Sequence, residues 1–237
     1  TKAIIPVHLF GQTADLGDLY NVAYGERPAI IEDAAQALGS KLSGVGTGHL
    51  GDLCCTSFFP SKNLGGFGDG GAVYGQNAEL LEKMKILRVH GSKPKYHHHM
   101  VGGNFRLDAL QAVVLHIKLE FLDQWAEQRR GNAQRYNQAF TELDLIAPHR
   151  LTPPYARDHE DHVYNQYVIR TPHRDALQTH LKARGIGTMI YYPSPLHTQP
   201  CFSDLGYAVG DFPVAELACK EVLALPVYPE LSDEDFN

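Results

Sequence analysis

The feature that most constrains the fold is a set of short apolar runs in the first hundred residues. Each run is bounded by turn or helix signals and holds few charges, a pattern typical of strands buried on both faces of a parallel sheet that helices cover. The runs are AIIPVHLF at 3–10, PAIIED at 28–33, DLCCTSFF at 52–59 and GGAVYG at 70–75. Apolar residues on one side of residues 77–89 predict a helix directly after the fourth run. We therefore expect an α/β fold in this half of the chain.

The second half of the chain follows a helical period. From Leu107 the apolar residues recur at steps of three and four, with charged and amide side chains between them. This predicts a long amphipathic helix towards Leu143, bent or broken near Gly131, whose apolar side packs on the core or on a second subunit. Beyond a group of prolines at 148–154 the pattern is α+β. We expect a strand at 162–170, a helix at 174–185, a strand at 188–192 and a helix at 214–225.

Composition argues against several classes of protein. The 237 residues carry a net charge of −6, with a pI near 6.1, so no basic surface favours nucleic acid or an anionic membrane as a partner. No apolar run reaches the roughly 20 residues that a membrane helix needs, and no secretion signal is recognisable. Four cysteines are too few and too irregularly spaced for a disulfide scaffold, which favours a reducing cytoplasm.

The stretch TSFFPSKNLGGFGDGGAV at 56–73 suggests a phosphate or cofactor loop, and two interpretations of it fail. Gly66, Gly68 and Gly71 match the dinucleotide pattern G-x-G-x-x-G, but that pattern must follow a strand and open a helix. Here the glycines lead into the apolar run at 70–75. A P-loop needs its lysine after the glycines, whereas Lys62 precedes them.

A third interpretation is a lysine that forms a Schiff base with pyridoxal 5'-phosphate (PLP). Such a site needs a near-neutral amine, a donor for the cofactor phosphate and a carboxylate for the ring nitrogen. Lys62 follows an apolar run and has Ser57 and Ser61 nearby, and Asp33 lies at the carboxyl end of a predicted parallel strand, where such sheets bind ligands. Taken singly, Asp33 could be a helix N-cap and Lys62 a solvated loop lysine. Their combination favours the cofactor site.

The chain resembles the DegT/DnrJ/EryC1/StrS family of nucleotide-sugar aminotransferases, which have the aspartate aminotransferase fold (fold type I). The resemblance rests on KAIIPVHLFGQ, IIEDAAQALGS, SFFPSKNLGGFGDGGAV, LRVHGS, NFRLDALQAVVLHIKL, GIGTMIYYPSPLHTQP and LALPVYPEL. It implies that residues 1–105 are the C-terminal part of the PLP-binding large domain, 106–147 a connecting helix and 148–237 an incomplete small α+β domain. The family's large domain begins well before the position that matches Thr1, so we expect a chain that is cut at both ends.

The resemblance also implies roles for individual residues. Lys62 is the Schiff-base lysine and proton shuttle, Asp33 pairs with the ring nitrogen, Gln36 with the phenolic oxygen and Ser57 with the phosphate. Asn104 matches an asparagine that binds the phosphate in the neighbouring subunit, which implies a homodimer with shared active sites. His197 matches a position associated with the sugar substrate.

The implied reaction transfers an amino group, from glutamate, to a nucleotide-linked keto-sugar, with pyridoxamine phosphate (PMP) as the intermediate. Family members that carry out a dehydration have histidine at the position of Lys62, so that branch is disfavoured. One alternative is a non-catalytic fragment or regulatory module that keeps the fold. Another is a metal site at His97–His99, but adjacent side chains diverge, so a solvated loop is the better account. The sugar, its nucleotide and the choice between C3 and C4 amination stay open.

Overall fold

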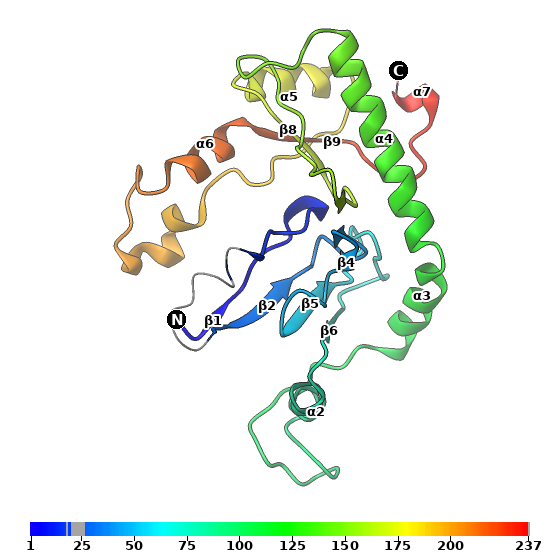
Figure 1. Ribbon diagram of the computed structural model, residues 1–237, viewed down its shortest axis with the longest axis vertical. Helices are drawn as coiled ribbons and strands as arrows, with labels where there is room; N and C mark the ends of the chain where they lie inside the picture. Colours follow the sequence, from blue (N-terminus) through cyan, green and yellow to red (C-terminus); the bar gives the residue numbers. More distant parts are fainter. Residues whose placement is uncertain (18, 20–26, 237) are drawn as a thin grey trace. The chain divides into compact units, whose positions relative to one another are not determined.

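The computed structural model describes residues 1–17, 19 and 27–236. The chain forms two compact units, and both contain helices and strands (Figure 1). The first unit comprises residues 1–127 and 157–165, and the second comprises residues 128–156 and 166–237. The predicted α/β class is confirmed. The predicted domain limits at residues 105 and 148 stay a prediction.

The first unit is organised around a four-stranded sheet with the strand order β1-β2-β5-β6 (Figure 1). β2 pairs in parallel with both β1 and β5. β6 runs antiparallel to β5, because the chain turns back through residues 58–70 without the crossover helix that a parallel pair needs. Each predicted apolar run contains one strand: β1 (Ala3–Ile4), β2 (Ala29–Asp33), β5 (Leu53–Ser57) and β6 (Gly71–Tyr74).

The apolar run at 3–10 is a strand over only two residues, contrary to the prediction. Pro6 has no amide hydrogen to donate, and Leu9–Gly11 form a single 3-10 turn (η1) in which Phe10 has a φ of 61°. A parallel bridge between Val7 and Asp33 nevertheless continues the pairing beyond β1. The segment after β1 therefore follows β2 to its carboxyl end.

A second, antiparallel sheet in the first unit has the strand order β4-β3-β7. It consists of β4 (Val45–Gly46), β3 (Lys41–Leu42) and β7 (Glu160–Asp161). Because β7 comes from residues 157–165, a segment far along the chain belongs to the first unit.

The predicted helix at 77–89 is confirmed as α2 (Ala78–Leu87), and the side chain of Asn77 caps it by accepting from two backbone amides. The predicted long helix is divided into α3 (Ala109–Leu119) and α4 (Leu122–Glu142). The break therefore lies at residues 120–121 and not near Gly131, which lies inside α4. A single glycine costs a helix only about 1 kcal/mol relative to alanine, so α4 continues through it.

The second unit contains a two-stranded antiparallel sheet of β8 (Tyr167–Arg170) and β9 (Val222–Leu225). The prediction of one helix over 214–225 was wrong for residues 222–225, because β9 is buried and pairs with β8. The predicted strand at 188–192 is reduced to one bridge between Met189 and Ala224. The remaining elements are α5 (Arg174–Ala183), η2 (Leu196–Thr198), η3 (Pro200–Leu205), α6 (Pro213–Glu221) and α7 (Asp233–Phe236).

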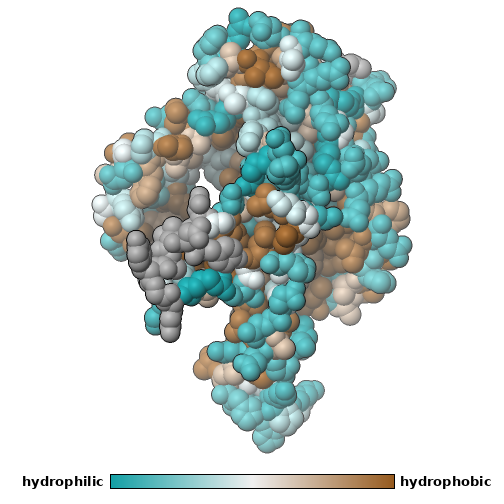
Figure 2. Space-filling model, viewed as in Figure 1, coloured by the Kyte–Doolittle hydropathy of each residue, from teal (hydrophilic) through white to brown (hydrophobic). Residues whose placement is uncertain are grey.

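The surfaces of the helices differ in polarity. Figure 2 shows mainly hydrophilic residues over the visible surface of α4. Four apolar side chains of α3, in contrast, are more than half exposed: Leu110, Val113, Ile117 and Leu119. In the part of the chain that the structure describes, no helix has both the length and the apolar character needed to cross a membrane.

Candidate active site

Asp33 is the last residue of β2 and lies at the carboxyl end of a strand with parallel neighbours on both sides, as predicted. Its amide donates to the carbonyl of Pro6, and its carbonyl accepts from the amide of His8, both at 2.9 Å. The carboxylate accepts from the amide of Ala35 at 3.0 Å. Residues 34–40 form turns, so Asp33 does not cap a helix. The N-cap alternative for Asp33 is therefore excluded.

Ser57 and Lys62 lie at the carboxyl end of β5, the strand next to β2, and in the loop after it. Ser57 ends β5, and its hydroxyl accepts from the amide of Phe59 at 3.2 Å. Because Asp33 pairs with Cys55 in the parallel register, Asp33 and Ser57 lie at the same end of adjacent strands. Lys62 lies five residues further along, in the loop after β5, and is half-buried.

Lys62 and Asp33 interact electrostatically. Burial lowers the pKa of the Lys62 amine below its usual value, and the Asp33 carboxylate opposes that effect. A lysine with a lowered pKa is neutral, and so nucleophilic, over a wider pH range than an exposed lysine. Amine, carboxylate and hydroxyl therefore meet at one edge of the sheet, a set of groups that fits PLP.

Gln36 lies just after β2, and its side-chain carbonyl accepts from the amide of Phe10 at 2.7 Å. Since the oxygen of this amide faces the backbone, its nitrogen is the group suited to donate to a phenolic oxygen. Gln36 is thus linked to the same segment, around Pro6 and Phe10, that pairs with Asp33.

The other two predicted site residues belong to other segments of the chain. Asn104 is exposed, and its side-chain oxygen accepts from Arg106 at 2.8 Å. His197 belongs to the second unit, where its Nε2 lies 3.0 Å from Glu216 and its ring lies 4.8 Å from that of Phe212.

The glycines after Lys62 serve close backbone packing. A Cβ on Gly65 would lie 2.3 Å from the carbonyl oxygen of Pro60, and one on Gly71 would lie 2.8 Å from that of Thr56. The stretch then enters β6 and not a helix. The rejection of a dinucleotide fingerprint is confirmed.

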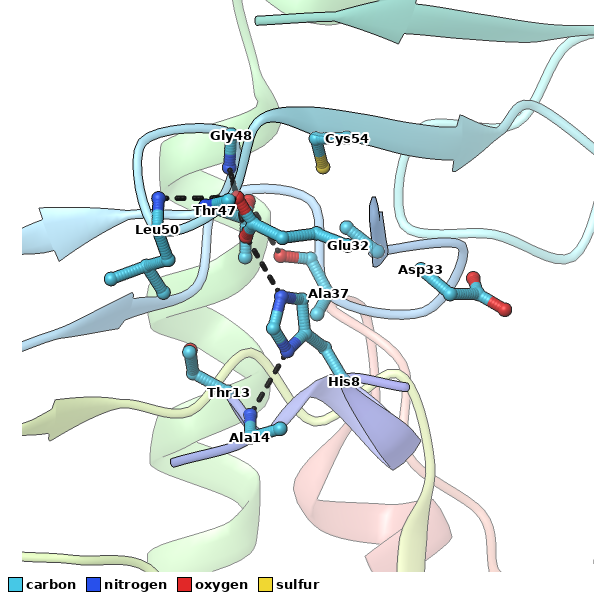
Figure 3. Close-up of polar contacts among 12 residues, drawn as sticks. His8, Thr13, Ala14, Glu32, Asp33, Ala37, Thr47, Gly48, Leu50 and Cys54 are labelled. Atoms are coloured by element: carbon cyan, nitrogen blue, oxygen red, sulfur yellow. Dashed lines mark hydrogen bonds and ion pairs between the residues drawn. The ribbon is translucent and has the colours of Figure 1, made fainter. Parts of the chain in front are cut away.

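The sequence analysis missed a buried polar network beside Asp33, shown in Figure 3. Glu32 is fully buried and accepts from the backbone amides of Gly48, Leu50 and Gly51. It also lies 2.9 Å from Nε2 of His8, which is itself fully buried. Burial alone would raise the pKa of Glu32, but these hydrogen bonds hold it below its ordinary value. An acidic residue two positions from Ile30, on the same buried side of an apolar strand, is the sequence signal for such a network.

The histidine run does not form a metal site in the structure. Nδ1 of His98 lies 2.8 Å from the carbonyl oxygen of His90, and Nε2 of His99 lies 2.6 Å from that of Lys93. Among the residues that the structure describes, no group of three or more histidine, cysteine, aspartate or glutamate side chains is arranged to hold a metal ion.

A lysine loop and a carboxylate at the ends of adjacent parallel strands, in a mixed sheet flanked by helices, define an α/β protein with the fold of type I aminotransferases. The chain belongs to the DegT/DnrJ/EryC1/StrS aminotransferase family, whose model matches residues 1–237.

Similar proteins come from several bacteria. The chain is 51% identical over 99% of its length to a pleiotropic regulatory protein of Geobacillus stearothermophilus, of which it covers 62%. It is 44% identical, again over 99% of its length, to a UDP-N-acetyl-3-dehydro-alpha-D-glucosamine 3-aminotransferase of Acidithiobacillus ferrooxidans, of which it covers 61%. The crystal structure of S. venezuelae DesV in complex with a ketimine intermediate matches with a TM-score of 0.92 at 39% identity, over 99% of this chain and 62% of that one. The chain thus spans about three fifths of the length of these relatives.

Proposed function

We propose that the protein is a PLP-dependent aminotransferase that transfers an amino group from glutamate to a nucleotide-linked keto-sugar. The observation that carries this proposal is the pair of Lys62 and Asp33. A half-buried lysine with a lowered pKa interacts with a carboxylate at the carboxyl end of the neighbouring parallel strand. Enzymes of this class need a nucleophilic amine and a carboxylate at the same end of the sheet.

Each residue at this edge has a distinct task. With the cofactor bound, Lys62 would hold it covalently through Nζ; once the amino group of the donor has displaced Nζ from the cofactor, the same amine would take the proton from the carbon that bears the donor's amino group. Asp33 keeps a proton on the ring nitrogen, Gln36 donates to the phenolic oxygen and Ser57 binds the phosphate. When bound, the cofactor would supply an electron sink for the carbanion that this proton transfer leaves.

The substrate class rests on the relatives. The name of the A. ferrooxidans protein specifies a UDP-linked 3-dehydro sugar, and we extend this class of nucleotide-linked keto-sugars to the present protein. We place His197 at the sugar, because its ring is held between a carboxylate and an aromatic side chain. Glu216 and Phe212 are these two contacts.

We further propose a homodimer in the cytoplasm with active sites shared between subunits. The exposed apolar side chains Leu110, Val113 and Ile117 on α3 are suited to a subunit contact. Asn104 lies exposed in the segment that leads into α3, as expected of a residue that serves the partner's cofactor phosphate. All four cysteines are unpaired thiols, in line with a reducing compartment.

One observation favours a second candidate, a regulatory protein that keeps the fold without transferring amino groups. The G. stearothermophilus relative carries the name of a pleiotropic regulatory protein. Retention of Lys62 with a lowered pKa disfavours this candidate, because a binding module has no need of a nucleophilic amine.

The test is an amino-transfer assay on the protein produced from its complete reading frame. With PLP, glutamate and a UDP-linked 3-keto sugar, we expect 2-oxoglutarate and the amino sugar to appear in equal amounts. Lys62→Ala removes the proton-transferring amine and should slow the reaction by about a thousandfold or more. An exposed-lysine control, Lys83→Ala in α2, should keep the rate. Cofactor binding without transfer to any nucleotide-linked keto-sugar would favour the regulatory candidate.

A further inference from the structure

The two residues at the carboxyl end of β2 that we propose as cofactor contacts, Asp33 and Gln36, both bond to one segment, Pro6–Ala14. This segment lies along the carboxyl end of β2, where Pro6 and His8 exchange two backbone hydrogen bonds of 2.9 Å with Asp33. Two residues beyond His8, the amide of Phe10 donates to the side chain of Gln36 at 2.7 Å. The placement of Asp33 and Gln36 is thus determined by how this segment is held.

Glu32 and His8 hold the segment from the other side of the strand. Successive side chains of a strand point to opposite faces, and Figure 3 shows the Glu32 carboxylate directed at His8 while the Asp33 carboxylate points away from both. Nδ1 of His8 accepts from the amide of Ala14 at 2.9 Å. Nε2 therefore carries the ring proton and donates it to Glu32 at 2.9 Å. The His8 ring thus links Ala14, at the far end of the segment, to Glu32 on β2.

The Glu32 carboxylate is itself fixed by the loop that follows β4. The amides of Gly48, Leu50 and Gly51 donate to it at 2.7–3.1 Å. A fully buried ionised carboxylate is costly unless its lone pairs are satisfied, and here four donors satisfy them. An apolar side chain could fill this space, but it could not link a loop, a strand and a histidine in one arrangement.

From this geometry we infer that Glu32 and His8 are positioning residues of the active site, acting through Asp33 and Gln36. This inference rests on the proposed function. Neither side chain touches the edge where the cofactor would bind. Their task is to hold the Pro6–Ala14 segment, and with it the Asp33 carboxylate and the Gln36 amide, in the place that the ring nitrogen and the phenolic oxygen require.

The test is a double-mutant cycle on PLP affinity in the protein from its complete reading frame. Lys62→Ala serves as the background, so that only the non-covalent contacts are measured, by equilibrium dialysis with PLP. Glu32→Gln keeps the shape of the side chain but replaces one of the two carboxylate oxygens by an NH₂ group, which cannot accept from the surrounding N–H donors. We expect it to weaken PLP binding about tenfold, the equivalent of one hydrogen bond to a charged group.

The cycle separates positioning from a general loss of structure. If Glu32 acts through Asp33 and Gln36, Glu32→Gln should weaken binding by less than about twofold when Asp33→Asn and Gln36→Ala are both already present, because coupled residues are not additive. Equal weakening in both backgrounds, or no weakening by Glu32→Gln alone, would overturn the inference. His8→Phe removes the same link and should give the same pattern if Glu32→Gln does not fold. Glu79→Gln, an exposed change in α2, should leave the affinity unchanged.

The outcome is distinguishable from a failure of the proposed function. If borohydride does not fix PLP to Lys62 in the unaltered protein, the proposed function itself is refuted. If PLP is fixed to Lys62 and Glu32→Gln binds it normally, only the positioning role of Glu32 and His8 is refuted.

Discussion

Acid should destabilise the first unit through His162. This side chain is 4% exposed, its ring stacks on Tyr164 with 3.9 Å between centroids, and its Nδ1 accepts from the amide of Tyr164 at 2.9 Å. Burial lowers the pKa of His162 from an ordinary 6.5 to about 4, although Glu160 opposes the effect. The folded protein therefore keeps His162 neutral in a pH range in which the unfolded chain binds a proton.

The sign and size of the effect follow from linkage. Stability is fully present above pH 6.5 and is lost as the pH falls towards about 4, because only the unfolded state takes up the proton in that interval. At roughly 1.4 kcal/mol for each pH unit, the loss amounts to about 3 kcal/mol. Glu32, whose pKa lies below its ordinary 4.5, loses its contribution only below that value. The window between about 4.5 and 6.5 thus reports mainly on His162.

The measurement is urea unfolding followed by the fluorescence of Trp125, the single tryptophan, which lies in the same unit as His162. In His162→Asn an amide oxygen can still accept from Tyr164, but the titrating ring is gone. We expect this variant to lose about 2 kcal/mol less free energy of unfolding than the parent between about pH 7 and 4.5. His116→Asn, an exposed change on α3, should follow the parent. Equal acid losses in the parent and in His162→Asn would refute the reasoning.

Three further predictions concern other sites. Asp33→Asn should lower the pKa of Lys62 further, because the Asp33 carboxylate raises that pKa. The pH dependence of amine labelling at Lys62 in the cofactor-free protein measures the change. An unchanged or raised pKa of Lys62 would contradict the proximity of the two groups. Gly11→Ala should destabilise the protein by about 2 kcal/mol or more. The reason is that Gly11 has a φ of +104° and a Cβ there would lie 2.8 Å from the amide nitrogen of Tyr164. A midpoint of urea unfolding equal to that of the parent would argue against this close approach. Asn77→Ala should cost about 1 kcal/mol by removing the cap of α2, and hydrogen exchange in the first turn of α2 that stays as slow as in the parent would count against the cap.

The elements that sequence could predict are those in which local pattern and tertiary environment agree. The strands β2 and β5 are buried apolar runs, so their positions followed from sequence alone. The stretch that contains β9 fits a helical period equally well, and only its pairing with β8 decides its conformation. The conformation of residues 188–192 also depends on tertiary pairing. Their apolar character predicts a strand, but only Met189 forms a bridge, with Ala224 of β9.

In the candidate site, too, some residues could be predicted from the sequence and others could not. Lys62 and Asp33 belong to recognisable motifs, and the sheet brings them to one edge. The network of Glu32 and His8 could not be predicted, because its partners are separated by 24 residues along the chain and its other donors are backbone amides of a third segment. Such a network exists only once the fold has formed.

The most direct test of the account is covalent attachment of the cofactor to Lys62. The protein from its complete reading frame is incubated with PLP, reduced with borohydride, digested and analysed by mass spectrometry. The account predicts that the reduced cofactor is found on Lys62, and that Lys62→Ala retains none. Attachment to another lysine, or an equal yield of attached cofactor in Lys62→Ala, would contradict it.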